Sequence, residues 1–249
     1  MSTAAATPVV SVIVPLWNSE RHLAETIASI DAQRIDGLQV VFVDDGSSDR
    51  SGRLARSLAP DAVHLRQPHQ GIAAALNRGV SLASGRYLTF LDADDLWPAQ
   101  SLALRLAACR EHPALDLIAG HVRQFASPVL DDDFRRSLVY PERPLPGYVM
   151  GAMLVRREAF DAVGRFDPGA SSAQSVDWVV RALDAGLAMG MIPDVVLLRR
   201  LHRDNHSHER LQLGAYPRIL KASLDRRRAA NRGLALPLPA PADARGPRR

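Results

Sequence analysis

Three carboxylates within four residues are the feature of this sequence with the clearest chemical meaning. Asp92, Asp94 and Asp95 follow residues 87–91, an apolar run that predicts a buried strand. Carboxylates this close together repel one another, and a divalent cation among them removes the repulsion. Oxygen ligands suit Mg²⁺ or Mn²⁺, above all where a diphosphate completes the coordination shell. The position at a strand end favours a metal site over a solvated acidic turn before a helix.

A second acidic pair, Asp44 and Asp45, follows the apolar run of residues 40–43. These side chains are also common turn formers before a helix, with Asp49 as the cap, and that role needs no ligand. In the functional interpretation, Asp44 accepts a hydrogen bond from the imide N–H of a uracil or from a ribose hydroxyl. The residues alone leave both interpretations open.

Two later residues have side chains that suit the same chemistry. His202 follows the strand predicted over residues 195–201 and is a candidate third metal ligand, because a neutral imidazole accepts Mn²⁺. The arginines beside it suit phosphate binding, or they form a solvated basic patch. Asp177 opens the helix predicted over residues 176–185. It is either a favourable charge at a helix N-terminus or a general base for an acceptor hydroxyl.

Alternating strands and helices must position these residues. Apolar runs predict strands at 9–14, 40–43, 63–65, 87–91 and 115–122, and helical periodicity predicts helices at 20–33, 49–58, 71–83 and 98–111. This alternation predicts an α/β fold with a Rossmann-like, mostly parallel central sheet flanked by helices. Ligands bind past the carboxyl ends of such strands, where both acidic groups fall.

The second half of the chain is less regular. Residues 126–147 are rich in proline and charge and predict a long surface loop or lid. Residues 149–155 resemble a strand and residues 156–163 a short helix. From Gly233 the chain is rich in Pro, Ala and Arg, which predicts a disordered tail.

The composition excludes several classes of protein. The chain has 249 residues, of which 47% are hydrophobic and 23% charged, so it is not disordered throughout. Its single cysteine excludes an intrachain disulfide and an all-cysteine metal site. The net charge of +4 divides unevenly: residues 218–249 hold nine basic and two acidic groups, and the other residues sum to −3. With 5% aromatic residues and no basic–aromatic interleaving, a nucleic-acid partner is not expected.

Membrane and export signals are weak. No stretch approaches the roughly 18 apolar residues that a spanning helix needs. Residues 1–19 carry no charge, so the positive segment of a secretory signal is missing before the apolar run. We expect a cytoplasmic protein, and peripheral contact with the inner face of the membrane stays open through the basic C-terminal segment.

An ordered set of motifs runs along residues 9–208. The set comprises residues 10–18, 43–49, 71–79, 90–95, 164–167 with 177–181, and 200–205. Each motif is weak alone, but in this order they resemble the family 2 inverting glycosyltransferases of GT-A fold. The resemblance implies a single GT-A domain over residues 9–215, with a nucleotide-sugar-binding half at 9–120 and an acceptor-binding half at 121–215. A disordered N-terminus at 1–8 and a basic C-terminal helix with a disordered tail at 216–249 would flank it.

The resemblance also implies an activity and its residues. A hexosyltransferase of this kind moves a sugar from a nucleotide-diphosphate donor, most often a UDP-sugar, to an acceptor hydroxyl in one displacement. The acceptor is a glycan, a lipid-linked sugar, a peptide or a small molecule. Mn²⁺ or Mg²⁺ would sit on Asp92, Asp94 and His202, and Asp177 would be the catalytic base. The residues implied in nucleotide-sugar binding are Pro15, Asn18, Glu20, Asp44, Asp45, Asn77, Asp92, Ala93 and Arg200.

Two departures from the family pattern keep alternatives open. Leu76 stands where the family often has an arginine, and Gln174-Ser175 stands where it commonly has a Glu-Asp pair. The missing pair leaves a non-catalytic nucleotide-sugar-binding protein as an alternative. A nucleotidyltransferase is less favoured, because it would want a glycine-rich basic loop after the first strand, where residues 15–18 read Pro-Leu-Trp-Asn.

Overall fold

The computed structural model describes residues 8–203 and 215–230. The disordered ends expected at 1–8 and beyond Gly233 fall almost wholly outside the described residues, as do Asp204 and Asn205 of the last motif. None of the helices in these ranges is both long and apolar enough to cross a membrane.

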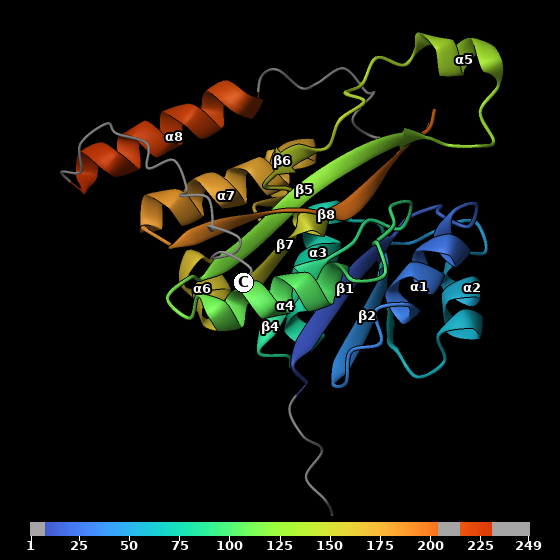
Figure 1. Ribbon diagram of the computed structural model, residues 1–249, viewed down its shortest axis with the longest axis horizontal. Coiled ribbons are helices and arrows are strands. Elements are labelled where there is room, and N and C mark those ends of the chain that lie inside the picture. The colour runs from blue at the N-terminus through green and yellow to red at the C-terminus, as the bar shows by residue number, and fades with distance from the viewer. Residues whose placement is uncertain (1–7, 204–214, 231–249) are drawn as a thin grey trace, which may run out of the picture.

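A central sheet of eight strands organises the molecule (Figure 1). The strand order is β3-β2-β1-β4-β7-β5-β6, and β8 pairs with β5. Four of the seven strand pairings are parallel, which confirms the predicted mostly parallel sheet. The strands are β1 (Val10–Leu16), β2 (Leu38–Asp44), β3 (Val63–Arg66), β4 (Tyr87–Phe90), β5 (Leu117–Ala126), β6 (Leu145–Gly147), β7 (Met153–Arg156) and β8 (Met189–Leu201).

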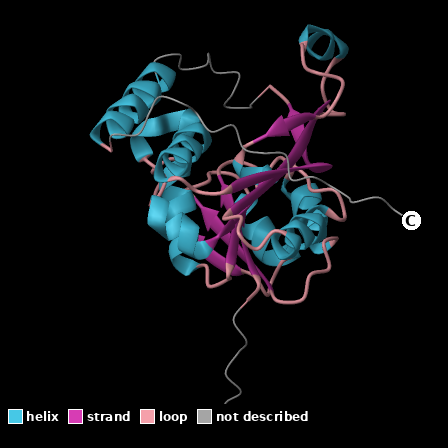
Figure 2. Cartoon of the chain, turned by 60° about the vertical axis from the view of Figure 1, so that its left-hand side comes forward, coloured by secondary structure: helices cyan, strands magenta, loops and turns pink. Residues whose placement is uncertain are grey.

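Helices lie on both sides of the sheet (Figure 2). They are α1 (Leu23–Asp31), α2 (Ser51–Leu58), α3 (Ile72–Leu82), α4 (Ser101–Glu111), α5 (Asp132–Ser137), α6 (Arg157–Val163), α7 (Gln174–Ala185) and α8 (Ala215–Ala229), with the short 3-10 helices η1 (Met150–Ala152) and η2 (Pro168–Ala173). One core cluster packs α1, α2 and α4 on the sheet, and a second packs α3, α6 and α7 on it. The two clusters make this a three-layer α/β architecture.

β1 is central because its sequence suits burial on both faces. It has a parallel neighbour on each side, and all its residues except the half-buried Pro15 are buried. Such strands read as continuous β-branched runs. Its one hydroxyl is satisfied, because Ser11 Oγ donates to Gln39 Oε1 at 2.6 Å and accepts from the Gly85 N–H at 2.8 Å.

Residues 126–147 are not the continuous surface loop that the sequence predicted. They contain α5 and β6, and β5 extends to Ala126, four residues past its predicted end. The extension pairs with β8, while β6 pairs with β5. α5 begins where the Asp131 carboxylate accepts a hydrogen bond from the Phe134 N–H at 2.9 Å. Strand pairing holds β6 and the end of β5, and a side-chain cap begins α5, so hydrophobic patterning did not indicate them.

Part of the basic C-terminal segment is neutralised within the fold. Asp184 of α7 is buried and accepts hydrogen bonds from the Ser223 hydroxyl at 2.9 Å, Arg226 Nε at 2.9 Å and Arg227 Nε at 2.7 Å. These contacts attach α8 to α7. Arg227 is itself buried, and its Nε lies 2.7 Å from the Asp184 carboxylate.

We expect Asp184→Asn to lower the free energy of unfolding by about 3 kcal/mol, because it leaves a buried arginine without its carboxylate. Asp225→Asn is the control, since the Asp225 pair with Lys221 is exposed and should contribute less than about 1 kcal/mol. Chemical denaturation measures the free energy of unfolding of each variant. Limited digestion by trypsin within α8 reports release of α8 from α7. Equal stability of the two variants would contradict this role of Asp184.

Candidate functional site

Parallel pairing brings three loops to one edge of the sheet. In the register, Leu16 at the end of β1 lies beside Asp44 at the end of β2, and Ile13 lies beside Phe90 at the end of β4. The loops that follow these strands, residues 17–20, 44–51 and 91–95, therefore lie next to one another, as expected of a ligand site in such a sheet.

Asn18 and Glu20 tie the first loop to the second. Asn18 Oδ1 accepts from the Ser48 N–H at 2.8 Å, and the Asn18 N–H donates to Ser47 Oγ at 3.1 Å. Asn18 has a φ of +50°, which asparagine tolerates better than most residues. Glu20 Oε2 accepts from the Arg50 N–H at 2.8 Å, and the contacts with Arg50 lower the pKa of Glu20. Both predicted nucleotide contacts thus also fix the loops.

Asp44 keeps one carboxylate oxygen for a further donor. It is buried, and its Oδ1 accepts from the Ser47 N–H at 2.8 Å. Its Oδ2 has no hydrogen-bond partner among the described residues, although Arg66 Nε lies 3.8 Å away. Glycine is required at residue 52, because a Cβ there would lie 2.5 Å from this oxygen. A buried acceptor without a donor is costly, so Asp44 fits a ligand that supplies an N–H or O–H.

Asp45 has a different environment from Asp44. Its carboxylate accepts from Gln67 Nε2 at 2.7 Å, from the Gln70 N–H at 2.9 Å and from the Gly71 N–H at 2.8 Å. These contacts involve both oxygens and hold the loop that precedes α3. The structure therefore gives Asp45 a positioning role, and its direct contact with a nucleotide-sugar stays a prediction.

Trp17 is a candidate site residue that the sequence reasoning missed. It follows β1 directly, its exposed fraction is 42%, and its ring stacks on His69 with 4.7 Å between centroids. An exposed aromatic side chain at the ligand edge offers a flat surface to a nucleobase. The signal was present in the sequence as an aromatic residue immediately after the first strand.

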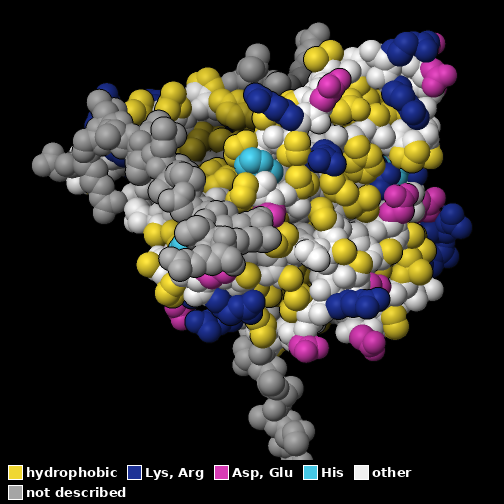
Figure 3. Space-filling view, in the orientation of Figure 1, with side chains coloured by type: hydrophobic (Ala, Val, Ile, Leu, Met, Phe, Trp, Pro, Cys, Tyr) yellow, Lys and Arg dark blue, Asp and Glu magenta, His cyan; other side chains and the backbone are white. Residues whose placement is uncertain are grey.

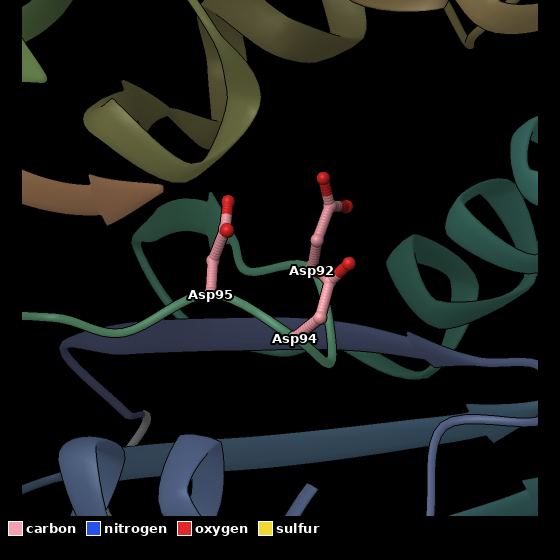
Figure 4. A group of neighbouring side chains, drawn as sticks. All are labelled: Asp92, Asp94 and Asp95. Carbon is pink, nitrogen blue, oxygen red and sulfur yellow. The ribbon is translucent and has the colours of Figure 1, made fainter. Parts of the chain in front are cut away.

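The acidic loop brings its three carboxylates together as predicted. Ligand oxygens of Asp92, Asp94 and Asp95 lie within 4.8 Å of one another, and Figure 4 shows all three side chains rising from the loop after β4. Loss of water, then the charge of Asp94, raises the pKa of Asp92 to about 6, although Asp92 retains solvent contact. The same causes raise the pKa of the buried Asp95 well above its usual range.

The end of β8 holds this loop. The Arg200 N–H donates to Asp95 Oδ1, its Nε donates to the Asp94 carbonyl, and its Nη2 donates to Glu25 Oε2, each at 2.8 Å. His202 Nε2 lies 2.8 Å from Asp94 Oδ2. Arg200 is 1% exposed, so the structure places this predicted phosphate ligand as a support of the acidic loop. Its contact with a donor stays a prediction.

The donor set fits a divalent cation. Three carboxylates converge, and the His202 imidazole contacts one of them, Asp94. Oxygen donors with imidazole suit Mn²⁺, while oxygen alone suits Mg²⁺. The charge of Asp94 is the second cause of the raised pKa of Asp92, after loss of water, and a bound cation would offset that charge. Ala93 is buried, and its carbonyl accepts from Thr26 Oγ1 at 3.0 Å, which anchors the loop on α1.

Asn77 and Asp177 lie in a third group, on α3 and α7. Asn77 Nδ2 donates to the Phe166 carbonyl and its Oδ1 accepts from the Phe166 N–H, both at 2.9 Å. Asp177 Oδ2 accepts from Arg181 Nε at 2.9 Å, and Oδ1 has no hydrogen-bond partner within the described ranges. No hydrogen bond or salt bridge between described residues joins either side chain to the acidic loop or to Asp44.

Comparisons with known proteins identify sugar-transferring relatives. The model of glycosyl transferase family 2 matches residues 11–164. The "Uncharacterized glycosyltransferase EpsJ" of Bacillus subtilis is 35% identical over 114 residues, 45% of this chain and 33% of that protein. A "PGL/p-HBAD biosynthesis glycosyltransferase" of Mycobacterium bovis is 39% identical over 123 residues, 47% of this chain and 48% of that protein. The matches thus span a third to about a half of these relatives.

Solved structures share the fold. TarS 1–349 of S. aureus, in complex with UDP-GlcNAc, superposes with a TM-score of 0.68 at 16% identity, over 87% of this chain and 66% of TarS 1–349. The mannosyltransferase PcManGT of Pyrobaculum calidifontis, in complex with GDP-Man and Mn²⁺, has a TM-score of 0.63 at 24% identity, over 93% of this chain and 66% of PcManGT. Both are GT-A glycosyltransferases, and at these identities the likeness establishes the fold.

We expect Asp94→Asn to weaken Mn²⁺ binding at least about tenfold, because it removes a charged ligand and the partner of His202. Asp133→Asn, in the exposed first turn of α5, is the control. Electron paramagnetic resonance of free Mn²⁺ during a titration gives the affinity of each variant. Equal affinities for wild type and Asp94→Asn would remove Asp94 from the metal site.

Proposed function

The chain belongs to glycosyl transferase family 2, and on that premise we propose that it moves a sugar from a nucleotide-diphosphate donor to an acceptor hydroxyl. The observation that carries the proposal is the meeting of two groups at one sheet edge. One is the acidic loop with His202, and the other is Asp44 with its unpartnered oxygen.

The proposed reaction is a single displacement with inversion. The acceptor oxygen forms a bond to the anomeric carbon, the bond from that carbon to the diphosphate breaks, and the hydroxyl proton passes to a base. We assign Asp177 as the base of this hexosyltransferase reaction. Its place in the order of the motifs implies that role. Arg181 fixes Asp177 Oδ2, which leaves Oδ1 to accept the proton.

Asp44 and Trp17 are the proposed contacts of the nucleotide base. Asp44 Oδ2 is an acceptor without a donor among the described residues, which matches the imide N–H of uracil. Trp17 offers an exposed ring directly after Leu16, the residue that lies beside Asp44 in the register. This pairing supports a UDP-sugar as the donor. Asn18 and Glu20 keep the two loops in place around it.

Asp92, Asp94 and His202 are the proposed holders of Mn²⁺ or Mg²⁺. When bound, such a cation stabilises the negative charge on the diphosphate leaving group. Arg200 and Glu25 keep the acidic loop in position through their ion pair.

One observation favours a second candidate function. Asp177 is paired with Arg181, and Gln174-Ser175 stand in place of a Glu-Asp pair, which leaves Asp177 as the one carboxylate assigned as base. A non-catalytic nucleotide-sugar-binding protein would keep the Asp44 and Asp94 sites without transfer. A nucleotidyltransferase has no such support here.

For location, we propose a cytoplasmic protein whose α8 contacts the inner face of the membrane. Tyr216 and Leu220 lie one turn apart on α8 and are 39% and 59% exposed, next to the exposed Lys221. Co-sedimentation with vesicles of anionic lipid measures this contact.

We expect UDP with Mn²⁺ to raise the unfolding temperature more than GDP with Mn²⁺, because a bound ligand stabilises the native state. Asp44→Asn should weaken UDP binding about tenfold, since it replaces a charged acceptor. Asp61→Asn, exposed on the loop before β3, is the control. A stronger response to GDP would overturn the uridine assignment, and no response to any nucleotide would overturn the donor site.

Asp177→Asn should lower the transfer rate about 100-fold or more while UDP affinity stays unchanged, because an amide cannot accept the proton. Donor hydrolysis and transfer to an acceptor mixture, followed by mass spectrometry, measure the loss. Asp161→Asn, exposed on the neighbouring α6, is the control. An unchanged rate would remove Asp177 from the mechanism, and nucleotide binding without turnover in wild type would support the binding protein.

A further inference from the structure

A surface pocket of about 170 Å³ lies among β5, β6 and β8. β5 contributes Val122 and Gln124, β8 contributes Arg199, and the segment around β6 contributes Arg143 and Leu145. We call it the Arg143–Arg199 pocket. Figure 3 shows Lys and Arg side chains among hydrophobic ones on this part of the molecule, over α5 and near β5 and β6, with Asp and Glu side chains also present there.

Strand register makes one wall of the pocket. Gln124 lies opposite Arg199 on β5 and β8, and Val122 lies opposite Leu145 on β5 and β6. Residues directly opposite on paired strands point to the same face. Arg200, the next residue of β8, points to the other face, where it supports the acidic loop. Consecutive residues of β8 therefore face the pocket and the acidic loop.

Neither arginine of the pocket is held by a direct ion pair among the described residues, although the charge of Arg199 partly offsets the rise that burial causes in the pKa of Asp92 and Asp95. Within residues 8–203 and 215–230, neither the Arg143 nor the Arg199 guanidinium takes part in a hydrogen bond or salt bridge. None of the nine lining residues is acidic. Guanidinium groups bind phosphate with paired N–H donors, and the Gln124 amide adds further donors. Leu145 and Val149 complete the pocket with apolar surface.

The sheet topology separates this pocket from the donor base. Asp44 on β2 and Trp17 after β1 lie on one side of β4 in the strand order, and β5, β6 and β8 lie on the other. β5 and β8 run parallel to each other and, through the two antiparallel pairings with β7, in the same direction as β4. Gln124 and Arg199 lie near the carboxyl ends of their strands, the same edge as the acidic loop.

We propose that the Arg143–Arg199 pocket binds a phosphate group of the sugar acceptor, with Val122, Leu145 and Val149 against a hydrocarbon part attached to it. The proposal rests on the proposed function, because the acceptor is the second substrate of that reaction. It narrows the acceptor from any hydroxyl compound to a phosphate monoester or diester. A lipid-linked sugar phosphate and a free sugar phosphate share this chemistry.

The test measures binding of three probes by calorimetry in metal-free buffer. Without metal, the acidic loop holds no cation that could itself bind phosphate. The probes are octyl phosphate, inorganic phosphate and octyl glucoside. The proteins are wild type, the double variant Arg143→Gln/Arg199→Gln, and the control Arg123→Gln. Arg123 is exposed on β5, the strand of Gln124, but its side chain points to the opposite face of the sheet. Thermal shifts with UDP and Mn²⁺ are recorded for each protein as an independent reading of the donor site.

Octyl phosphate should bind wild type and Arg123→Gln alike and the double variant at least about tenfold more weakly, with the UDP response unchanged. If inorganic phosphate bound as tightly as octyl phosphate, the anion site would be supported and the apolar part of the proposal overturned. That result would point to a free sugar phosphate as the acceptor. The proposal would be overturned if octyl glucoside bound wild type as tightly as octyl phosphate. It would also be overturned if octyl phosphate bound all three proteins with the same affinity. If octyl phosphate bound but UDP with Mn²⁺ gave no thermal shift, the pocket would be supported and the donor site rejected. Failure of the pocket proposal and failure of the proposed function are therefore distinguishable.

Discussion

Charge repulsion within the acidic loop is the constraint on which the rest of the site depends. Asp92, Asp94 and Asp95 hold their oxygens within 4.8 Å of one another, and contacts from both α1 and β8 hold the loop. Asp95 and Arg200 are 105 residues apart in the sequence. The nucleotide half of the site therefore takes part of its support from the C-terminal half of the chain.

Buried arginines support this arrangement in two different ways. Arg200 faces the carboxylate of Glu25 and lies over the Phe125 ring, so its charge is neutralised beside the acidic loop. Arg105 is 0% exposed and donates to Thr89 Oγ1 and the Met153 carbonyl, with its guanidinium over Trp97. Burial lowers the pKa of Arg105 to about 9. It links β4, which leads into the acidic loop, to β7.

The distribution of charge over the molecule follows from these contacts. The acidic excess of the body lies at the ends of β2 and β4, where ligand groups are expected. Asp184 neutralises part of the basic C-terminal segment by attaching α8 to α7. Arg143 and Arg199 are then a separate pair of basic groups in the pocket among β5, β6 and β8, and the charge of Arg199 also acts on Asp92 and Asp95.

The sequence by itself determined the alternating strands and helices, the mostly parallel sheet and the place of the acidic loop. These follow from local patterns, because β-branched runs and helical periodicity are set by neighbouring residues. Only the tertiary structure decided what each polar side chain contacts. Asp45 supports the loop before α3, Asn77 binds the Phe166 backbone and Arg200 holds the acidic loop, and each was expected at a nucleotide-sugar. β6 and the end of β5 were likewise not indicated by hydrophobic patterning, since pairing between distant strands forms them.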